Sequence, residues 1–180
     1  MKCLMQIKRW FASKLPTIER GTKGHSLQSA KSVALIYQHR TEGHFKEIRE
    51  LAQQMRQDYG LDRVARFTYI DTLKGDVPVW QMQKLESNFI CKSDLNFMGK
   101  PEGEAKLFCK ETFDLLINIE QELPLALMHV VRESQAHMKV AVRQPERNED
   151  YDVIFEPNPA HSDSQRIQQI LAFLSNTQLI

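Results

Sequence analysis

Seven polar side chains are expected at the ends of buried strands, where they could form a binding site. Arginine and histidine side chains bind anions, and carboxylates and amides form hydrogen bonds with the hydroxyl groups of sugars. If one edge of a sheet brings these groups together, the sequence predicts a site for an anion or a sugar-like ligand. The alternative is that these positions are polar only because loops are solvated. The seven residues are Gln38, His39, Arg40, Asp71, Asn118, Arg143 and Asp152.

A repeated pattern bears on this site. FDLLIN (residues 113–118) and YDVIFE (residues 151–156) each place an aspartate before an aliphatic run. In a parallel α/β sheet, ligands bind outside the carboxyl ends of the strands. Asp114 opens its strand, so we expect it at the opposite edge, where it caps or pairs locally. Asp152 also opens a strand, and it reaches the carboxyl edge only if that strand runs antiparallel to its neighbours.

Motifs for nucleotide binding and nucleophilic catalysis are not found. The turn after the first strand, QHRTEGHFKE, lacks the G-x-G-x-x-G pattern that lets a backbone approach a pyrophosphate. MGKPEG lacks the upstream glycine and the Ser/Thr of a phosphate loop, so it is predicted to be a turn. There is no G-x-S-x-G elbow. The sequence therefore predicts no cofactor and favours a protein without catalytic activity.

Metal ligation and thiol chemistry are also unfavoured. His129 and Glu133 lie four residues apart on a predicted helix, but without a second histidine they are expected to be a surface pair. No metal site is predicted. Cys3, Cys91 and Cys109 are an odd number of cysteines with no C-x-x-C pair. This pattern is typical of reduced, buried and inert thiols in a reducing compartment.

The apolar patterns after residue 31 predict alternating strands and helices. SVALIYQ is a continuous apolar run typical of a strand covered on both faces. An amphipathic helix follows, with Thr41 available as its cap and Gly60 at its end, and then the strand RVARFTYI. Strand, helix, strand is the unit of a parallel sheet. Residues 71–100 show no single period. The remaining predicted strands are NFICK, FDLLINI, MKVAV and YDVIF, and the remaining helices are EAKLFCKET, LALMHVVRES after Pro124, and a last helix capped by Ser162 or Asp163.

The direction of the last strand is predicted from the length of the connection before it. Only residues 144–150 separate the last two strands, and a parallel crossover usually needs about a dozen residues. The sequence therefore predicts an antiparallel hairpin at or near one edge of the sheet. The complete prediction is a three-layer α/β fold with a mostly parallel sheet, preceded by a basic N-terminal helix.

The first part of the chain differs from the rest in charge. Residues 1–30 hold six basic residues and one acidic residue, a net charge of +5, whereas the rest holds 18 basic and 22 acidic residues, a net charge of −4. We predict a basic amphipathic helix and linker over residues 1–27 and a single α/β domain over residues 28–180. The helix has three possible roles: it packs on its own domain, lies on an anionic membrane, or contacts RNA phosphates.

Nucleic acid is the least favoured of these partners, because the acidic body offers no extended basic patch. The arm is instead expected to contact an unidentified protein partner or an anionic membrane surface. No stretch approaches the roughly 20 apolar residues of a membrane-spanning helix, and no signal peptide is recognisable. We therefore predict a cytoplasmic protein that can be peripheral to the inner face of the membrane. The contact candidates are Lys2, Lys8, Arg9, Trp10, Phe11 and Lys14.

Several segments together resemble a known family. AKSVALIYQ, NFMGKP, FDLLINI, SQAHMKVAV and YDVIFEP, in this order, are similar to a family of small bacterial proteins known only as a domain of unknown function. The resemblance covers roughly residues 28–175 and implies a bacterial, cytosolic α/β domain, without any transferable functional residue. A fainter likeness links FDLLINIE and SQAHMKVAV to one half of heptosyltransferase-type sugar transferases.

Two functions are consistent with these observations. The first is a ligand-binding or interaction module whose basic arm contacts a partner or a membrane. The alternative is a small enzyme that acts on a phosphorylated or glycosidic metabolite at the predicted polar edge. The enzyme requires a concave pocket that joins His39, Arg40, Asp71, Asn118 and Asp152.

Overall fold

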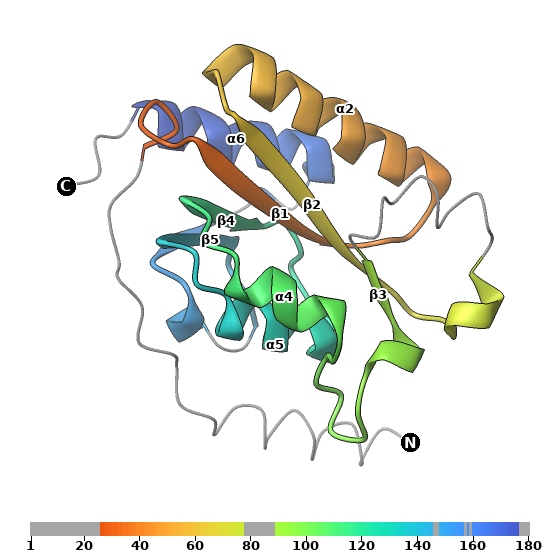
Figure 1. The fold of residues 1–180 in the computed structure, drawn as a ribbon. Coiled ribbons are helices and arrows are strands. Elements are labelled where there is room, and N and C mark those ends of the chain that lie inside the picture. The colour runs from red at the N-terminus through yellow and green to blue at the C-terminus, as the bar shows by residue number, and fades with distance from the viewer. Residues whose placement is uncertain (1–25, 78–88, 146–147, 157, 159, 177–180) are drawn as a thin grey trace.

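A computed structural model describes residues 26–77, 89–145, 148–156, 158 and 160–176. In these residues six strands form one sheet in the order β3-β2-β1-β4-β5-β6, and every pairing is parallel. Helices cover both faces of the sheet (Figure 1), which confirms the α/β prediction. The strands are β1 (Ser32–Gln38), β2 (Arg63–Ile70), β3 (Phe89–Cys91), β4 (Leu115–Asn118), β5 (Met138–Val142) and β6 (Val153–Phe155). The helices are α2 (Glu42–Tyr59), α4 (Glu104–Lys110), α5 (Leu125–Glu133) and α6 (Asp163–Asn176).

Local signals in the sequence place most of these elements. The Thr41 hydroxyl oxygen accepts a hydrogen bond from the His44 N–H at 3.1 Å and begins α2, and Gly60 ends it at φ 63°. Ser162 and Gln165 bond reciprocally at the start of α6, side chain to backbone N–H in both directions, at 3.3 and 2.9 Å. This arrangement is a capping box.

The predicted antiparallel hairpin is wrong. β6 runs parallel to β5, with Val140 opposite Val153 and Val142 opposite Phe155. The prediction assumed a helical crossover, but β6 has only three residues, so the chain needs to return only a short distance. Extended chain covers about 3.3 Å per residue, so the ten residues of the connection reach far enough without a helix. A single 3-10 turn, Asn148–Asp150, lies within this connection.

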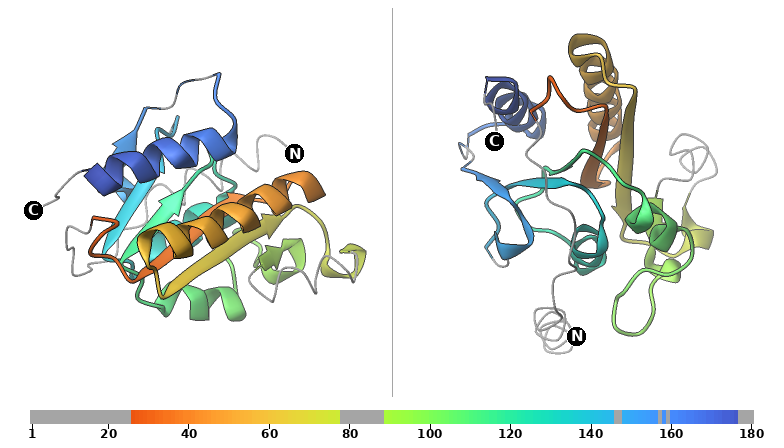
Figure 2. Two further views of the ribbon diagram at one scale, coloured as in Figure 1. Left: turned by 90° about the horizontal axis from the view of Figure 1, so that it is seen from above. Right: turned by 60° about the vertical axis from the view of Figure 1, so that its left-hand side comes forward.

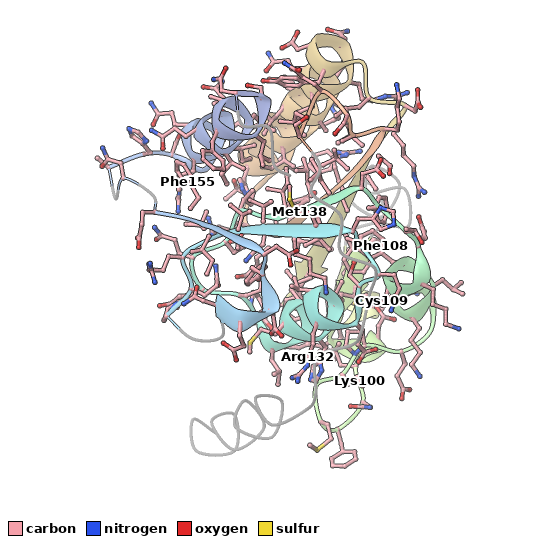
Figure 3. The ribbon with its side chains drawn as sticks, turned by 90° about the vertical axis from the view of Figure 1, so that its left-hand side faces the viewer. Lys100, Phe108, Cys109, Arg132, Met138 and Phe155 are labelled. Carbon is pink, nitrogen blue, oxygen red and sulfur yellow. The ribbon has the colours of Figure 1, made fainter. Side chains whose placement is uncertain are left out.

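The sheet separates two hydrophobic cores (Figures 2 and 3). α2 and α6 lie next to each other on one face, where they pack on residues such as Met138 and Phe155. α4 and α5 cover the other face, where Phe67 and Phe108 stack with ring centroids 4.2 Å apart. Successive residues of a strand point to opposite faces, so the continuous apolar runs supply both cores.

The described body begins slightly before the predicted domain boundary. Leu27, which we assigned to the linker, is fully buried in the α2/α6 core, and its N–H donates to the Leu174 carbonyl at 3.2 Å. The basic arm and its six candidate contact residues lie outside the described residues. Among the described residues, no helix combines the length and the apolar character needed to span a membrane.

Candidate functional site

The carboxyl ends of β1, β2 and β3 border a cavity of about 500 Å³, which we call the carboxyl-edge cavity. The loops after these strands form one wall, and the loop before α5 together with the first turn of α5 forms the other. Ligands of parallel α/β proteins bind at this edge of the sheet, and the volume suits a small molecule. The lining residues are Gln38, Tyr69, Asp71, Lys92, Leu95, Asn96, Gly99, Glu122, Pro124, Leu125 and Ala126.

Two charged side chains that line this cavity, Asp71 and Lys92, neutralise each other. The Tyr69 hydroxyl donates to Asp71 Oδ1 at 2.8 Å, and Lys92 Nζ lies 3.2 Å from the same oxygen. Burial of Tyr69, together with its hydrogen bond to Asp71, raises the pKa of this phenol far above its usual range. Tyr69 therefore stays protonated and acts as a donor. The Asp71 and Lys92 side chains remain 62% and 49% exposed, so a ligand can reach them.

A tight turn forms the outer wall of the cavity. Asn96 Oδ1 accepts hydrogen bonds from the N–H groups of Met98 and Lys100, at 2.9 and 3.1 Å. Gly99 has a φ of 80°, and a Cβ at this position would lie 2.7 Å from Leu125 Cδ2. The left-handed backbone favours glycine here, and a larger residue would also displace the Leu125 side chain of α5. The turn holds Leu95 and Asn96 against the cavity.

Glu120 closes the crevice between β1 and β4, where the strand order reverses. Its side chain is only 1% exposed, accepts a hydrogen bond from the Gln38 N–H at 2.8 Å, and forms an ion pair with Arg40. Folds of this strand order commonly hold a bound phosphate in such a crevice. Here the Glu120 carboxylate occupies the crevice and accepts from the Gln38 N–H. A phosphate is not needed at this position, which is consistent with the absence of a glycine-rich loop after β1.

Asn118 belongs to the buried network behind Glu120. It is fully buried, its amide nitrogen donates to the Tyr151 hydroxyl at 2.9 Å, and its Oδ1 accepts from the Glu120 N–H at 3.0 Å. The Gln144 amide donates to the Glu120 carbonyl and, at 2.7 Å, to the Val142 carbonyl. These groups fix the backbone after β4 and are not available to a ligand.

His39 lies at the carboxyl edge but toward α2. Its ring centroid is 6.3 Å from that of Phe45. Burial, followed by the proximity of His44, lowers the pKa of His39 below its usual value. His39 is therefore neutral at pH 7 and does not line the carboxyl-edge cavity.

The two aspartates of the repeated pattern perform the same structural task at the amino edge. Asp114 Oδ2 accepts from the N–H groups of Lys31 and Ser32, at 2.8 and 2.9 Å, and from the Ser32 hydroxyl. Asp152 Oδ2 accepts from the Lys139 N–H at 2.7 Å. Each carboxylate thus caps the start of a neighbouring strand. The prediction is confirmed for Asp114 and wrong for Asp152, because β6 is parallel.

The predicted polar edge is therefore only partly assembled. Of the seven candidates, Gln38 and Asp71 line the cavity, while Arg143 lies farther along the same edge, in an ion pair with Glu156 after β6. Sequence reasoning missed other lining and supporting residues. These residues lie at or directly after strand ends, and that position could have identified them. Residues 71–100 show no single period, however, so the strand end at β3 was not predicted clearly. The missed residues are Tyr69, Lys92, Asn96, Glu120 and Glu122.

The two described cysteines are buried in an environment that favours the neutral thiol. Burial raises the pKa of Cys109, which is labelled in Figure 3, to about 12. The Glu133 carboxylate adds to the effect. Burial and a hydrogen bond to Asp94 also raise the pKa of Cys91. A thiol whose pKa is raised forms little thiolate at neutral pH. This supports the prediction of inert thiols at both positions.

The predicted surface pair on α5 is half wrong. His129 is 4% exposed, because the apolar face of α5 turns it inward, whereas Glu133 forms a 2.7 Å ion pair with Lys100 at the surface. Within the described ranges, no group of three or more histidine, cysteine, aspartate or glutamate side chains is close enough together to hold a metal ion.

Comparison with known proteins gives one match. A family of unknown function, DUF6913, matches residues 5–176. The chain belongs to this family. No curated protein and no solved structure matches the chain, so the fainter likeness to sugar transferases gains no support. The family has no assigned activity, and function must therefore be argued from the geometry above.

Proposed function

We propose that this chain is a small-molecule-binding domain whose ligand occupies the carboxyl-edge cavity. One observation carries the proposal: a cavity of about 500 Å³ lies at the carboxyl ends of parallel strands and is lined by both polar and apolar side chains. Binding sites for small molecules commonly combine these properties.

The ligand that fits best is uncharged and rich in hydroxyl groups, with one apolar face. Asp71 and Lys92 already neutralise each other, and Glu122 adds a second carboxylate to the lining, so a phosphate group would meet no spare positive charge. Paired charges still form hydrogen bonds with hydroxyl groups. Leu95 and Leu125 offer a surface for the apolar face of a sugar or nucleoside.

Binding is favoured over catalysis by the state of the polar groups. Asp71 is held by Tyr69 and Lys92, and Tyr69 is kept protonated. A general base needs a free lone pair near the reacting proton and a pKa near the operating pH. The other residues required by the enzyme hypothesis lie away from the cavity, with Asp152 at the opposite edge of the sheet.

The test is a binding screen with adenosine, glucose and inositol, followed by thermal unfolding and NMR line broadening. Leu125→Trp should fill the cavity and abolish binding of any compound that stabilises the wild type. Leu107→Trp is the matched control, because Leu107 is 63% exposed on α4 and does not line the cavity. The proposal fails if no compound binds with saturation, or if both tryptophan variants weaken binding equally.

The basic arm is the second part of the proposal, and it rests on the sequence alone. Residues 1–30 carry a net charge of +5, and the arm interleaves Trp10 and Phe11 with Lys8, Arg9 and Lys14. Such a segment suits contact with an anionic membrane or an acidic partner. Deleting residues 1–25 should move the protein to the soluble fraction and remove its co-purifying partners. An unchanged distribution would contradict this role.

A further inference from the structure

A second concave surface lies on the other face of the sheet, between α2 and the first half of β2. It encloses about 650 Å³ and includes three arginines, and we call it the arginine groove. β3 pairs with β2 only at residues 68–70, so the groove lies where β2 has no outer neighbour strand among the described residues (Figure 1). The lining residues are Arg49, Ala52, Gln53, Arg56, Gln57, Leu61, Val64 and Arg66.

The positive charges of this groove are not neutralised by any acidic side chain among the described residues. None of the eight lining residues is acidic, and none of the three guanidinium groups forms an ion pair within the described residues. Within the described residues, the hydrogen bond of the Arg56 guanidinium group goes to the Asp62 carbonyl, at 3.4 Å. In contrast, Arg63 on the same strand points to the opposite face and pairs with Glu111 at 2.6 Å.

Arg66 has a buried hydrogen-bond donor that lacks an acceptor among the described residues. Its guanidinium carbon lies 5.4 Å from the ring centroid of Phe45, which orients the group. Its Nη1 is buried and has no hydrogen-bond acceptor in the described part of the chain. A buried donor without an acceptor is destabilising, and an anion that approaches this guanidinium group would supply one.

We propose that the arginine groove binds a small anion that carries two or more linked phosphate groups. Guanidinium groups match phosphate oxygens through paired hydrogen bonds. Arg49 and Arg56 are seven residues apart on α2, a rise of about 10 Å that the length of several linked phosphate groups matches. An extended polyphosphate bridges them, with Arg66 between α2 and β2 and the Gln53 and Gln57 amides available along the path.

A purely structural role accounts for only part of the cluster. Arg56 lies in the last turn of α2, where a cation stabilises the helix dipole, and Arg66 packs on Phe45. Neither explanation applies to Arg49 in the middle of the helix. The test must therefore measure binding and not only stability.

The experiment uses the full chain and inorganic tripolyphosphate in isothermal titration calorimetry at fixed ionic strength. Saturable binding at one site is expected. Arg49→Gln and Arg66→Gln should each weaken it by about tenfold, as expected for the loss of charge-assisted hydrogen bonds. Arg63→Gln is the matched control and should leave the affinity unchanged.

Three results would overturn the proposal. The first is equal loss of affinity in Arg63→Gln and Arg49→Gln, which would indicate general charge attraction. The second is citrate binding as tightly as tripolyphosphate, which would remove the preference for phosphate. The third is binding of a short RNA that depends on these arginines while tripolyphosphate does not bind, which would assign the groove to nucleic acid. Far-UV circular dichroism of each variant distinguishes lost binding from lost folding.

Discussion

The two concave regions of this molecule differ in how their charges are balanced. In the carboxyl-edge cavity, Asp71, Lys92 and Tyr69 satisfy one another. In the arginine groove, three cations face a common space without an acidic lining residue. This difference shows that the number of charged side chains in a site does not by itself identify the ligand. The charge left over after internal pairing is more informative, because an unpaired charge can form an ion pair with a charged ligand, whereas paired charges offer a ligand only hydrogen bonds.

In the crevice between β1 and β4, Glu120 pairs with groups of the chain itself and leaves no space for a ligand. Removing its carboxylate should have the largest effect of the changes considered. Glu120→Ala leaves the Gln38 N–H without its acceptor and Arg40 without the buried carboxylate. We expect a loss of about 3 kcal/mol in the free energy of unfolding. Urea denaturation measures it.

Glu120→Gln is the matched control for this prediction, because it keeps an acceptor for the Gln38 N–H and removes only the charge. It should cost less than Glu120→Ala. An unchanged urea midpoint in the alanine variant would show that the closed crevice does not contribute to stability.

Variants of the two capping aspartates at the amino edge test whether ligand binding depends on the strand caps. Asp114→Ala removes the acceptor of three hydrogen bonds, so we expect a loss of about 2 kcal/mol in the free energy of unfolding, and a smaller loss for Asp152→Ala. Neither variant should change ligand binding in the native state. Calorimetric titration of both variants with tripolyphosphate checks this, and altered affinity would argue that the edges are coupled.

Asp71→Asn should make the carboxyl-edge cavity behave like the arginine groove. Lys92 then loses its ion pair, and the cavity gains an unpaired cation. The double variant Arg49→Gln/Arg66→Gln should bind tripolyphosphate weakly. Adding Asp71→Asn to it should increase the affinity for tripolyphosphate about tenfold. Glu122→Gln is the control, since it removes one negative charge from the lining without releasing Lys92. Equal binding in both variants would contradict the role of internal pairing.

The arginine groove and the carboxyl-edge cavity should also differ in how strongly salt weakens ligand binding, although this effect is smaller. Attraction between exposed charges is screened over about 10 Å at 0.1 M salt. Tripolyphosphate binding to the arginine groove should therefore weaken severalfold as salt increases, while binding of an uncharged ligand to the cavity should not. Titrations of the wild type at low and high salt measure both, and parallel salt dependences would remove the distinction.

The smallest effect concerns His39, which follows β1 and lines neither region. Its pKa is lowered in the folded protein, first by burial and then by His44, so the unfolded chain binds the proton more readily. Stability should therefore fall as the pH decreases below about 6.5, the unfolded value, until the lower folded pKa is passed. His39→Gln should reduce this dependence. Urea midpoints at neutral and mildly acidic pH test it, and an unchanged slope would exclude this contribution.

The sequence by itself determined the elements whose signals are local. The boundaries of β1 and β2, the Thr41 and Ser162 caps, and the apolar stripe of α6 follow from apolar period and cap chemistry, which act over a few residues. The amino-edge position of Asp114 was predicted from its place at the start of a strand, but its capping partners Lys31 and Ser32 lie 83 and 82 positions away in the chain. The α/β class followed from the alternation of these elements.

Only the tertiary structure decided the direction of β6, the filling of the crevice by Glu120, and the unpaired state of the arginine groove. Each depends on distances between residues far apart in the chain: Gln38 and Glu120 are 82 positions apart. The strand period places Arg63 and Arg66 on opposite faces of β2, but it does not predict that Arg63 pairs with Glu111 while Arg66 has no ion pair among the described residues. Residue types set which charges a chain carries, but packing of the sheet decides which of them remain for a ligand.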